Sequence, residues 1–173
     1  MNVKKIISIG AVVIAAILLI YGFVLIRQIF SANTKFSEEK VYVYVPTGSD
    51  YEAVKNLISP YVEDMQRFEL VAGKTSYPEN VKSGRFLLKN GMSSYDLVKT
   101  MRINDPVKLA FNNQERLENL AGRVGSQIEP DSLSLWTTFK DSTFLKENGF
   151  TEDNVFVMFI ANTYEVYWNI IAT

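Results

Sequence analysis

The chain has 173 residues, with 18 Lys and Arg, 19 Asp and Glu, and neither Cys nor His. These two absences exclude a disulfide framework, a thiol nucleophile, a Ser-His-Asp triad and the common zinc ligands, so we expect no metal and no cofactor. Beyond residue 40 the acids outnumber the bases and no basic run occurs, which argues against a nucleic acid as partner.

An unbroken apolar run extends from Ile6 to Ile26. As a helix it is about 31 Å long, which matches the hydrocarbon thickness of a bilayer. A cleaved signal peptide is the alternative, but its apolar core usually spans only about 7 to 15 residues. We therefore predict a transmembrane anchor within residues 1–30. Lys4 and Lys5 precede it, so the N-terminus is expected in the cytoplasm and the bulk of the chain outside the inner (cytoplasmic) membrane.

After a polar linker, residues 31–40, the sequence predicts a small module over residues 41–104. Its expected elements, in chain order, are a strand over 41–45, helices over 50–59 and 61–72, a strand over 84–88 and a helix over 93–101. Two of these helices are preceded by N-terminal capping patterns, which begin at Ser49 and at Ser93. We expect the two strands to pair beneath the helices.

Residues 105–173 form a further segment. Its expected elements are a strand over 107–111, helices over 113–128, 132–139 and 142–148, and a buried strand over 155–160. The fold class is therefore predicted to be α+β, with one N-terminal transmembrane helix. The chain stops on an apolar edge at residues 169–173, so we expect it to be a truncated part of a longer protein.

Four segments carry a family resemblance: VYVYVPTGSDYEAVKNL, SGRFLLKNGMSSYDLVKTM, VKLAFNNQERLENLAGRV and FIANTYEVYW. Behind a single anchor, and in this order and spacing, they resemble the MltG (YceG-like) endolytic murein transglycosylases. The resemblance covers nearly all of this chain. A family member is longer, and only about its first half is matched. It implies a LysM-like glycan-binding subdomain over residues 41–104 and the start of an α+β catalytic domain over residues 105–173.

The resemblance also implies an activity. Such an enzyme cleaves the β-1,4 bond between N-acetylmuramic acid and N-acetylglucosamine within nascent peptidoglycan, leaves 1,6-anhydroMurNAc ends and terminates glycan elongation. One carboxylic acid suffices for this lyase chemistry, because it protonates the glycosidic oxygen and then accepts the proton of the sugar's own 6-hydroxyl. The acid must be protonated near neutral pH, which apolar or aromatic surroundings favour. This chain alone is expected to be inactive.

Glu165 fits the role of this acid best. It follows the apolar run 155–160, and its aromatic neighbours would supply desolvation and a stacking face for sugar rings. The expected substrate-binding residues are Asn162 and Thr163, which match a polar pair of the family, and the aromatic neighbours Tyr164, Tyr167 and Trp168. The alternative for Asn162 and Thr163 is that they only cap a turn. The simpler alternative is that Glu165 is a solvated residue at a strand end.

The family's usual acid lies elsewhere. A Glu-Gly pair precedes the Pro of its Pro-Asp-Thr-Tyr block, whereas Phe156 and Val157 stand at those positions here and Ala161 replaces the Pro. Two interpretations follow. Either the acid has moved to Glu165, or the chain is catalytically silent.

The expected partners are peptidoglycan glycan strands and, through Ile6–Ile26, membrane lipid. An alternative function is that of a non-catalytic, membrane-tethered peptidoglycan-binding or scaffold protein that uses residues 40–102 alone. A third is recruitment of peptidoglycan synthases by helix packing, since small residues such as Gly10 and Ala15 permit close approach.

Overall fold

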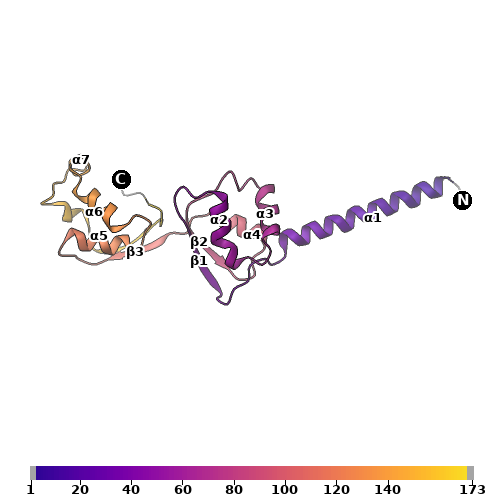
Figure 1. The fold of residues 1–173 in the computed structure, drawn as a ribbon, viewed down its shortest axis with the longest axis horizontal. Helices are drawn as coiled ribbons and strands as arrows, with labels where there is room; N and C mark the ends of the chain where they lie inside the picture. The colour runs from indigo at the N-terminus through magenta and orange to yellow at the C-terminus, as the bar shows by residue number, and fades with distance from the viewer. Residues whose placement is uncertain (1–2, 171–173) are drawn as a thin grey trace.

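A computed structural model describes residues 3–170, with side chains from residue 9 onward. Figure 1 shows three parts in a row: a long helix that projects alone, a central module, and a second module at the far end. We call residues 31–104 the first module and residues 105–170 the second module. In chain order, the elements are α1 (Val3–Phe30), β1 (Lys40–Val45), α2 (Tyr51–Ile58), the 3₁₀ turn η1 (Ser59–Tyr61), α3 (Met65–Lys74), β2 (Gly84–Lys89), α4 (Ser94–Thr100), β3 (Val107–Phe111), α5 (Leu117–Gly125), α6 (Ser132–Lys140), α7 (Ser142–Glu147), the 3₁₀ turn η2 (Val155–Met158) and β4 (Asn162–Val166). Mixed helices and two-stranded sheets confirm the expected α+β class.

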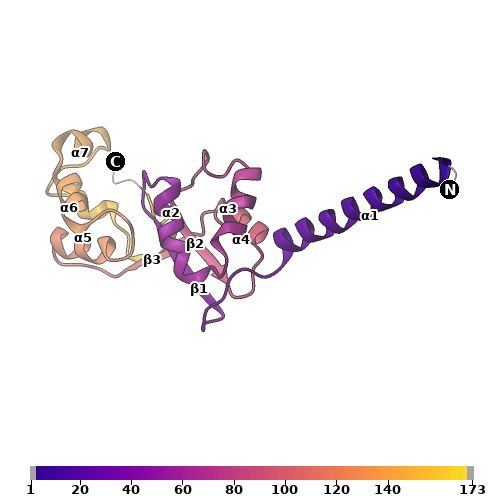
Figure 2. The ribbon, with the colours of Figure 1, turned by 45° about the vertical axis from the view of Figure 1, so that its right-hand side comes forward.

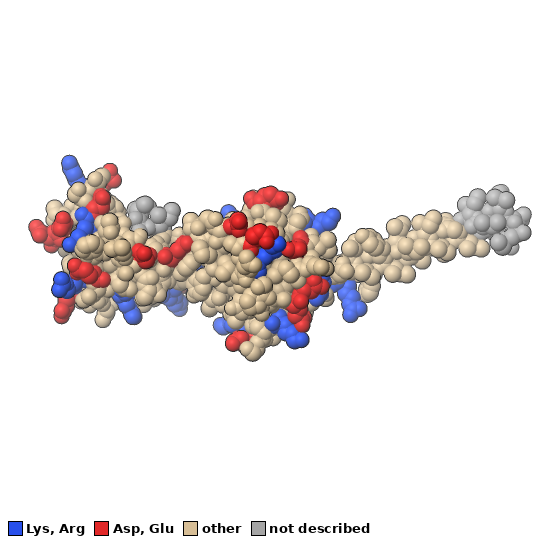
Figure 3. All heavy atoms as spheres, in the orientation of Figure 1, with Lys and Arg blue, Asp and Glu red and all other residues tan. Residues whose placement is uncertain are grey.

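Helix α1 extends beyond the apolar run at both ends. Within the described residues it is the one helix that is long and apolar enough to cross a membrane, over Ile9–Phe30, and none of this span is buried in the protein. Figures 2 and 3 show it as an isolated stem whose described surface is uncharged until the vicinity of the first module. An apolar surface of this size without protein cover is what a bilayer-spanning helix presents. The side chains of Lys4 and Lys5 lie outside the described ones.

The first module has the predicted order of strand, helix, helix, strand and helix. β1 and β2 pair antiparallel, from Lys40 opposite Lys89 to Val45 opposite Gly84. Side chains alternate across the sheet, so one face packs on α2, α3 and α4 and the other faces outward. The shared core consists of Val43, Val45, Val54, Ile58, Phe68, Val71, Ala72, Tyr77, Phe86, Leu88, Leu97, Val98 and Met101.

Some helix boundaries differ from the predicted ones. Asp50, not Ser49, caps α2, since its carboxylate accepts a hydrogen bond from the backbone N–H of Ala53 at 2.8 Å. Pro60 lies inside the 3₁₀ turn η1, and the chain is extended at Val62, so α3 begins only at Met65, with Asp64 as its cap. Because Pro60 has no N–H to donate, α2 does not continue through it.

The polar segment 31–40 is not a free linker. Asn33 is fully buried within it. Its Nδ2 donates to the Asp64 carbonyl and to Ser94 Oγ, both at 2.8 Å, and its Oδ1 accepts from the Asp64 N–H at 2.9 Å. The segment therefore joins the end of α1 to the starts of α3 and α4, and it belongs to the first module.

Arg67 strengthens this junction. Its guanidinium donates to Ser31 Oγ at 2.7 Å and pairs with the Asp64 carboxylate at 3.0 Å. A hydrogen bond from the Arg67 backbone N–H, together with this pairing, lowers the pKa of Asp64. A lowered folded-state pKa means that the capping interaction is present at neutral pH and is lost on acidification through that pKa.

We expect Asn33→Ala to lower the free energy of unfolding by about 2–3 kcal/mol, because it strands the polar groups of Asp64 and Ser94. Chemical denaturation of the full chain in detergent micelles, followed by near-UV circular dichroism, measures the loss. Asn56→Ala, on the exposed side of α2, is the matched control and should change stability by less than about 0.5 kcal/mol. An equally small effect of Asn33→Ala would contradict the proposed role of Asn33 at the junction.

The second module is a two-stranded ribbon packed on helices. β3 and β4 pair antiparallel, from Val107 opposite Val166 to Phe111 opposite Asn162. The apolar face of α5 is buried against α6 and the ribbon, and the core consists of Val107, Leu109, Leu117, Leu120, Ala121, Val124, Ile128, Leu135, Phe139, Leu145 and Val155. α5 and α6 approach closely at Gly125, where a Cβ atom would lie 2.7 Å from the backbone nitrogen of Ser132.

The buried strand expected over residues 155–160 is wrong. Residues Val155–Met158 form the turn η2, and only Val155 enters the core, whereas Val157 is 75% exposed. Neither edge of β3 is open to this strand. One edge of β3 pairs with β4, and on the other edge the Gln127 side chain bonds both the N–H and the carbonyl of Ala110, each at 3.0 Å.

Candidate functional site

The two modules are held together by polar contacts of Asn169 and Glu129 in the second module with loops of the first. Asn169 donates to Ser83 Oγ at 2.9 Å and accepts from Asn104 Nδ2 at 2.8 Å. Glu129 accepts from the backbone N–H of Thr47 at 2.6 Å and from its hydroxyl at 2.7 Å. These contacts reach from loops of the second module to loops at one end of the first. They fix the relative position of the surfaces on either side of the junction.

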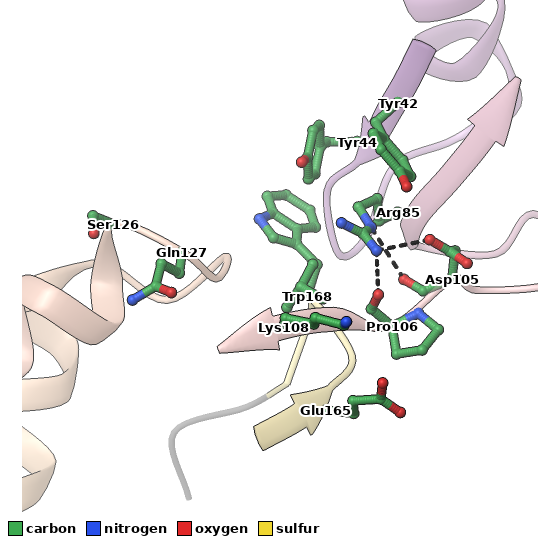
Figure 4. Close-up of a pocket in the computed structure, with 11 residues that line it drawn as sticks. Tyr42, Tyr44, Arg85, Asp105, Pro106, Lys108, Ser126, Gln127, Glu165 and Trp168 are labelled. Atoms are coloured by element: carbon green, nitrogen blue, oxygen red, sulfur yellow. Dashed lines mark hydrogen bonds and ion pairs between the residues drawn. The ribbon is translucent and has the colours of Figure 1, made fainter. Parts of the chain in front are cut away.

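A groove of about 790 Å³ lies at this junction. We call it the inter-module groove. It is lined by Tyr42, Tyr44, Arg85, Asp105, Pro106, Val107, Lys108, Ser126, Gln127, Glu165 and Trp168. In Figure 4, Tyr42 and Tyr44 lie at one end of the view and Glu165 at the other, with Arg85, Pro106 and Lys108 between them.

The first module contributes the outer face of its sheet. Because Val43 and Val45 point into the core, the alternating Tyr42 and Tyr44 point outward into the groove. The Arg85 guanidinium lies 4.2 Å from the centre of the Tyr42 ring. It also pairs with the Asp105 carboxylate at 2.7 Å and donates to the Pro106 carbonyl.

The second module contributes the outer face of its ribbon. Lys108 on β3 stands directly opposite Glu165 on β4, and both side chains are exposed. Trp168 follows the end of β4, and its ring meets Tyr44 at 5.1 Å between centroids, with an interplanar angle of 63°. The groove thus brings together Glu165 and Trp168, two of the candidate residues, with side chains from a different module.

The expected enclosure of Glu165 by aromatic rings is wrong for this structure. Glu165 is solvent-exposed, because it lies on the side of the ribbon that faces away from the helices. Tyr164 lies on the helix side instead, where its ring stacks on Phe111 at 5.7 Å. The alternation of side chains along β4 therefore separates Glu165 from its nearest aromatic neighbour.

The remaining predicted site residues divide between two places. Asn162 and Thr163 line a second groove of about 790 Å³ at the other end of the ribbon, the distal groove. Its full lining is Ala110, Phe111, Asn112, Gln114, Arg123, Ala161, Asn162 and Thr163. Tyr167 is 58% exposed and lines neither groove. Glu165 lies three residues after Asn162 and two residues after Thr163. The two grooves are therefore about 7–10 Å apart along β4.

The inter-module groove combines ring faces with hydrogen-bonding groups, which suits a ligand that carries both C–H faces and hydroxyls. It holds two carboxylates. Asp105 is paired with Arg85, whereas Glu165 forms no ion pair within the described residues. Glu165 is therefore the carboxylate that remains free to exchange a proton with a ligand. No cluster of three or more potential metal ligands occurs in the described part of the chain.

Sequence comparison identifies the family. The model of the YceG-like family matches residues 43–173, which is most of the chain. The chain belongs to the YceG-like family. A crystal structure of a yceG-like protein from Listeria monocytogenes is similar at 19% identity, with a TM-score of 0.39, over 79% of this chain and 51% of that one. No curated protein matches the chain. This YceG-like chain thus spans about half the length of the Listeria protein.

Membership in the YceG-like family suggests a lytic transglycosylase at the level of the family. All but one of the side chains that line the inter-module groove fall inside the matched residues. The exception is Tyr42, one residue before the match begins. Sequence reasoning singled out Glu165 and Trp168 but missed Tyr42, Tyr44 and Arg85. The alternation within residues 41–45, with Val on one face and Tyr on the other, was the signal that could have found the two tyrosines.

Proposed function

We propose that this protein is an endolytic peptidoglycan transglycosylase, anchored by α1 in the inner membrane with its N-terminus in the cytoplasm. It cleaves MurNAc–GlcNAc bonds within nascent strands and leaves 1,6-anhydroMurNAc ends. The observation that carries the proposal is the position of Glu165. This unpaired carboxylate lines a groove whose other walls hold aromatic rings from both modules, in a chain of the YceG-like family.

Glu165 would act as both acid and base. The protonated carboxyl group donates its proton to the glycosidic oxygen as the C1–O bond breaks, and the positive charge develops on C1 and the ring oxygen. The 6-hydroxyl of the same MurNAc then attacks C1, and the Glu165 carboxylate accepts its proton. Because this proton restores the carboxyl group, each turnover returns Glu165 to its starting state. No water molecule enters the product.

The exposure of Glu165 in the free groove sets a requirement on substrate binding. A glycan strand seated between the Tyr42–Tyr44 end and the ribbon would exclude water from the carboxylate. Desolvation disfavours the charged form of a carboxyl group, so the bound sugar itself would favour the protonated acid. The ammonium group of the neighbouring Lys108 would donate hydrogen bonds to sugar oxygens.

A second function is favoured by a specific observation. The usual Glu-Gly pair of the MltG-type enzymes is replaced here by Phe156 and Val157, and the usual Pro by Ala161. Glu165 is also exposed. A membrane-tethered scaffold that binds peptidoglycan without cleaving it would need neither an enclosed acid nor the usual motif.

The two functions are separated by an assay of the protein encoded by the complete reading frame, reconstituted in nanodiscs. Uncross-linked glycan strands of known length serve as substrate, and products are identified by mass spectrometry. Endolytic cleavage gives fragments of intermediate length with new 1,6-anhydro ends. Intact strands would contradict the enzyme and support the scaffold, and disaccharides alone would contradict the endolytic mode.

A further inference from the structure

The outer face of the β1–β2 sheet is not covered by the helices of the first module. Helices α2, α3 and α4 pack on the inner face, and α1 and the segment 31–34 occupy the end of the module where α3 and α4 begin. At the other end, Thr47 and Ser83 bind the second module. The outer sheet face, which carries Tyr42 and Tyr44, is open to solvent and continues into the inter-module groove.

The aromatic side chains on this face are fixed before any ligand arrives. Tyr42 is held by the Arg85 guanidinium, whose side chain is only 15% exposed because Asp105 and the Pro106 carbonyl bind it. Tyr44 is held by its edge contact with Trp168. Rings that are already ordered lose little conformational entropy when a ligand stacks on them.

The exposure of these rings leaves room for a ligand. Tyr42 is 40% exposed and Tyr44 is 41% exposed, so each retains accessible ring surface after these contacts. The positive charge of Arg85 is offset by Asp105, which leaves the platform without an excess charge to attract a polyanion. Aromatic faces with flanking hydroxyl and amide groups suit the C–H faces and hydroxyls of a neutral sugar.

We propose that Tyr42, Tyr44 and Trp168 form a saccharide-binding platform for a β-1,4-linked N-acetylhexosamine chain, which spans the junction of the two modules. The identification of this polymer rests on the proposed function, whereas the existence of the platform rests on the geometry. The platform is separate from the reacting group, since Glu165 lies at the opposite end of the groove (Figure 4). A strand held on it extends over Lys108 to Glu165, so the first module positions the chain that the second module cleaves.

The test uses a chito-oligosaccharide of six N-acetylglucosamine units as the probe. Its affinity for the full chain in nanodiscs is measured by titration calorimetry. We expect the double variant Tyr42→Ala/Tyr44→Ala to weaken binding about tenfold, equivalent to about 1.4 kcal/mol, because it removes both stacking surfaces that the first module offers. Tyr44→Phe keeps the ring and should retain affinity within about threefold.

Tyr95→Ala is the matched control. Tyr95 is exposed to a similar extent, 42%, but lies on α4 beside Phe30, away from the groove. Thermal unfolding of each variant establishes that it is folded. Unchanged affinity in a folded double variant, or an equal loss with Tyr95→Ala, would overturn the platform.

The same measurements separate this inference from the proposed function. Glu165→Gln should bind the probe as tightly as the unmodified chain, because the acid lies beyond the platform. If the complete protein fails to cleave glycan yet the double variant loses probe binding, the enzyme proposal fails and the platform stands. If cleavage occurs and the double variant binds the probe normally, the enzyme stands and the platform is overturned.

Discussion

Glu165→Gln in the complete protein should abolish the release of 1,6-anhydro-ended fragments while leaving glycan binding intact. The amide keeps the size of the carboxyl group but can neither donate a proton to the glycosidic oxygen nor accept one from the 6-hydroxyl. General acid–base catalysis typically contributes about 10²–10⁴-fold, and here one residue supplies both steps, so we expect a loss at the upper end of that range. Initial rates of anhydro-end formation, quantified by mass spectrometry, measure the loss.

The matched control is Glu152→Gln, which alters an exposed acid of the same module outside both grooves. It should leave the rate within about twofold, as expected for a surface substitution. Equal rates for Glu165→Gln and the unmodified protein would show that the reacting acid lies elsewhere. Loss of probe binding by Glu165→Gln would assign Glu165 to binding instead of catalysis.

Gly84→Ala should destabilise the first module by about 3–5 kcal/mol. Gly84 has a φ of +135°, which is unfavourable for any residue with a Cβ atom, and strain of this kind costs roughly 1–3 kcal/mol. The added Cβ would lie 2.3 Å from Asn104 Cγ and displace that side chain. Asn104 would then lose its hydrogen bonds with the Arg85 N–H and with Asn169, at about 1 kcal/mol each. Denaturant unfolding of the full chain in micelles measures the change.

Two controls separate the causes of this loss. Gly73→Ala places a methyl group at an open, exposed position inside α3 and should stabilise the chain by about 0.5–1 kcal/mol. Combining Gly84→Ala with Asn104→Ala removes the clash but keeps the backbone strain. The double variant should therefore lose no more stability than the sum of the single variants. A neutral Gly84→Ala would contradict the assigned conformation.

Patterns that act within one segment predicted the fold well. The period of 3.6 residues identified the buried face of α5, and the alternation within residues 41–45 identified β1. Prediction failed where contacts between distant segments decide the structure. The apolar run 155–160 reads as a strand, yet β3 has β4 on one edge and the Gln127 side chain on the other. The polar residues 31–40 read as a linker, yet Asn33 is buried by residues that lie 31 and 61 positions away.

The candidate site shows the same division. Glu165 and Trp168 were found because they are close in sequence and follow a recognisable block. The opposite wall was missed, because Tyr42 and Tyr44 are more than 100 residues earlier and only the inter-module contacts bring them to Glu165. The expected burial of Glu165 failed for a local reason. Alternation along β4 puts Tyr164 on the helix side and Glu165 on the open side.

The most direct test is to locate a bound glycan on the protein. An N-acetylglucosamine oligomer with photoreactive groups is bound to the full-length Glu165→Gln protein in nanodiscs, irradiated, and the labelled peptides are sequenced by mass spectrometry. We predict that labels concentrate on residues 41–45 and 163–168, on the two walls of the inter-module groove. Labels confined to the helices α2, α3 and α4, with none on either wall, would contradict a shared glycan path past Glu165.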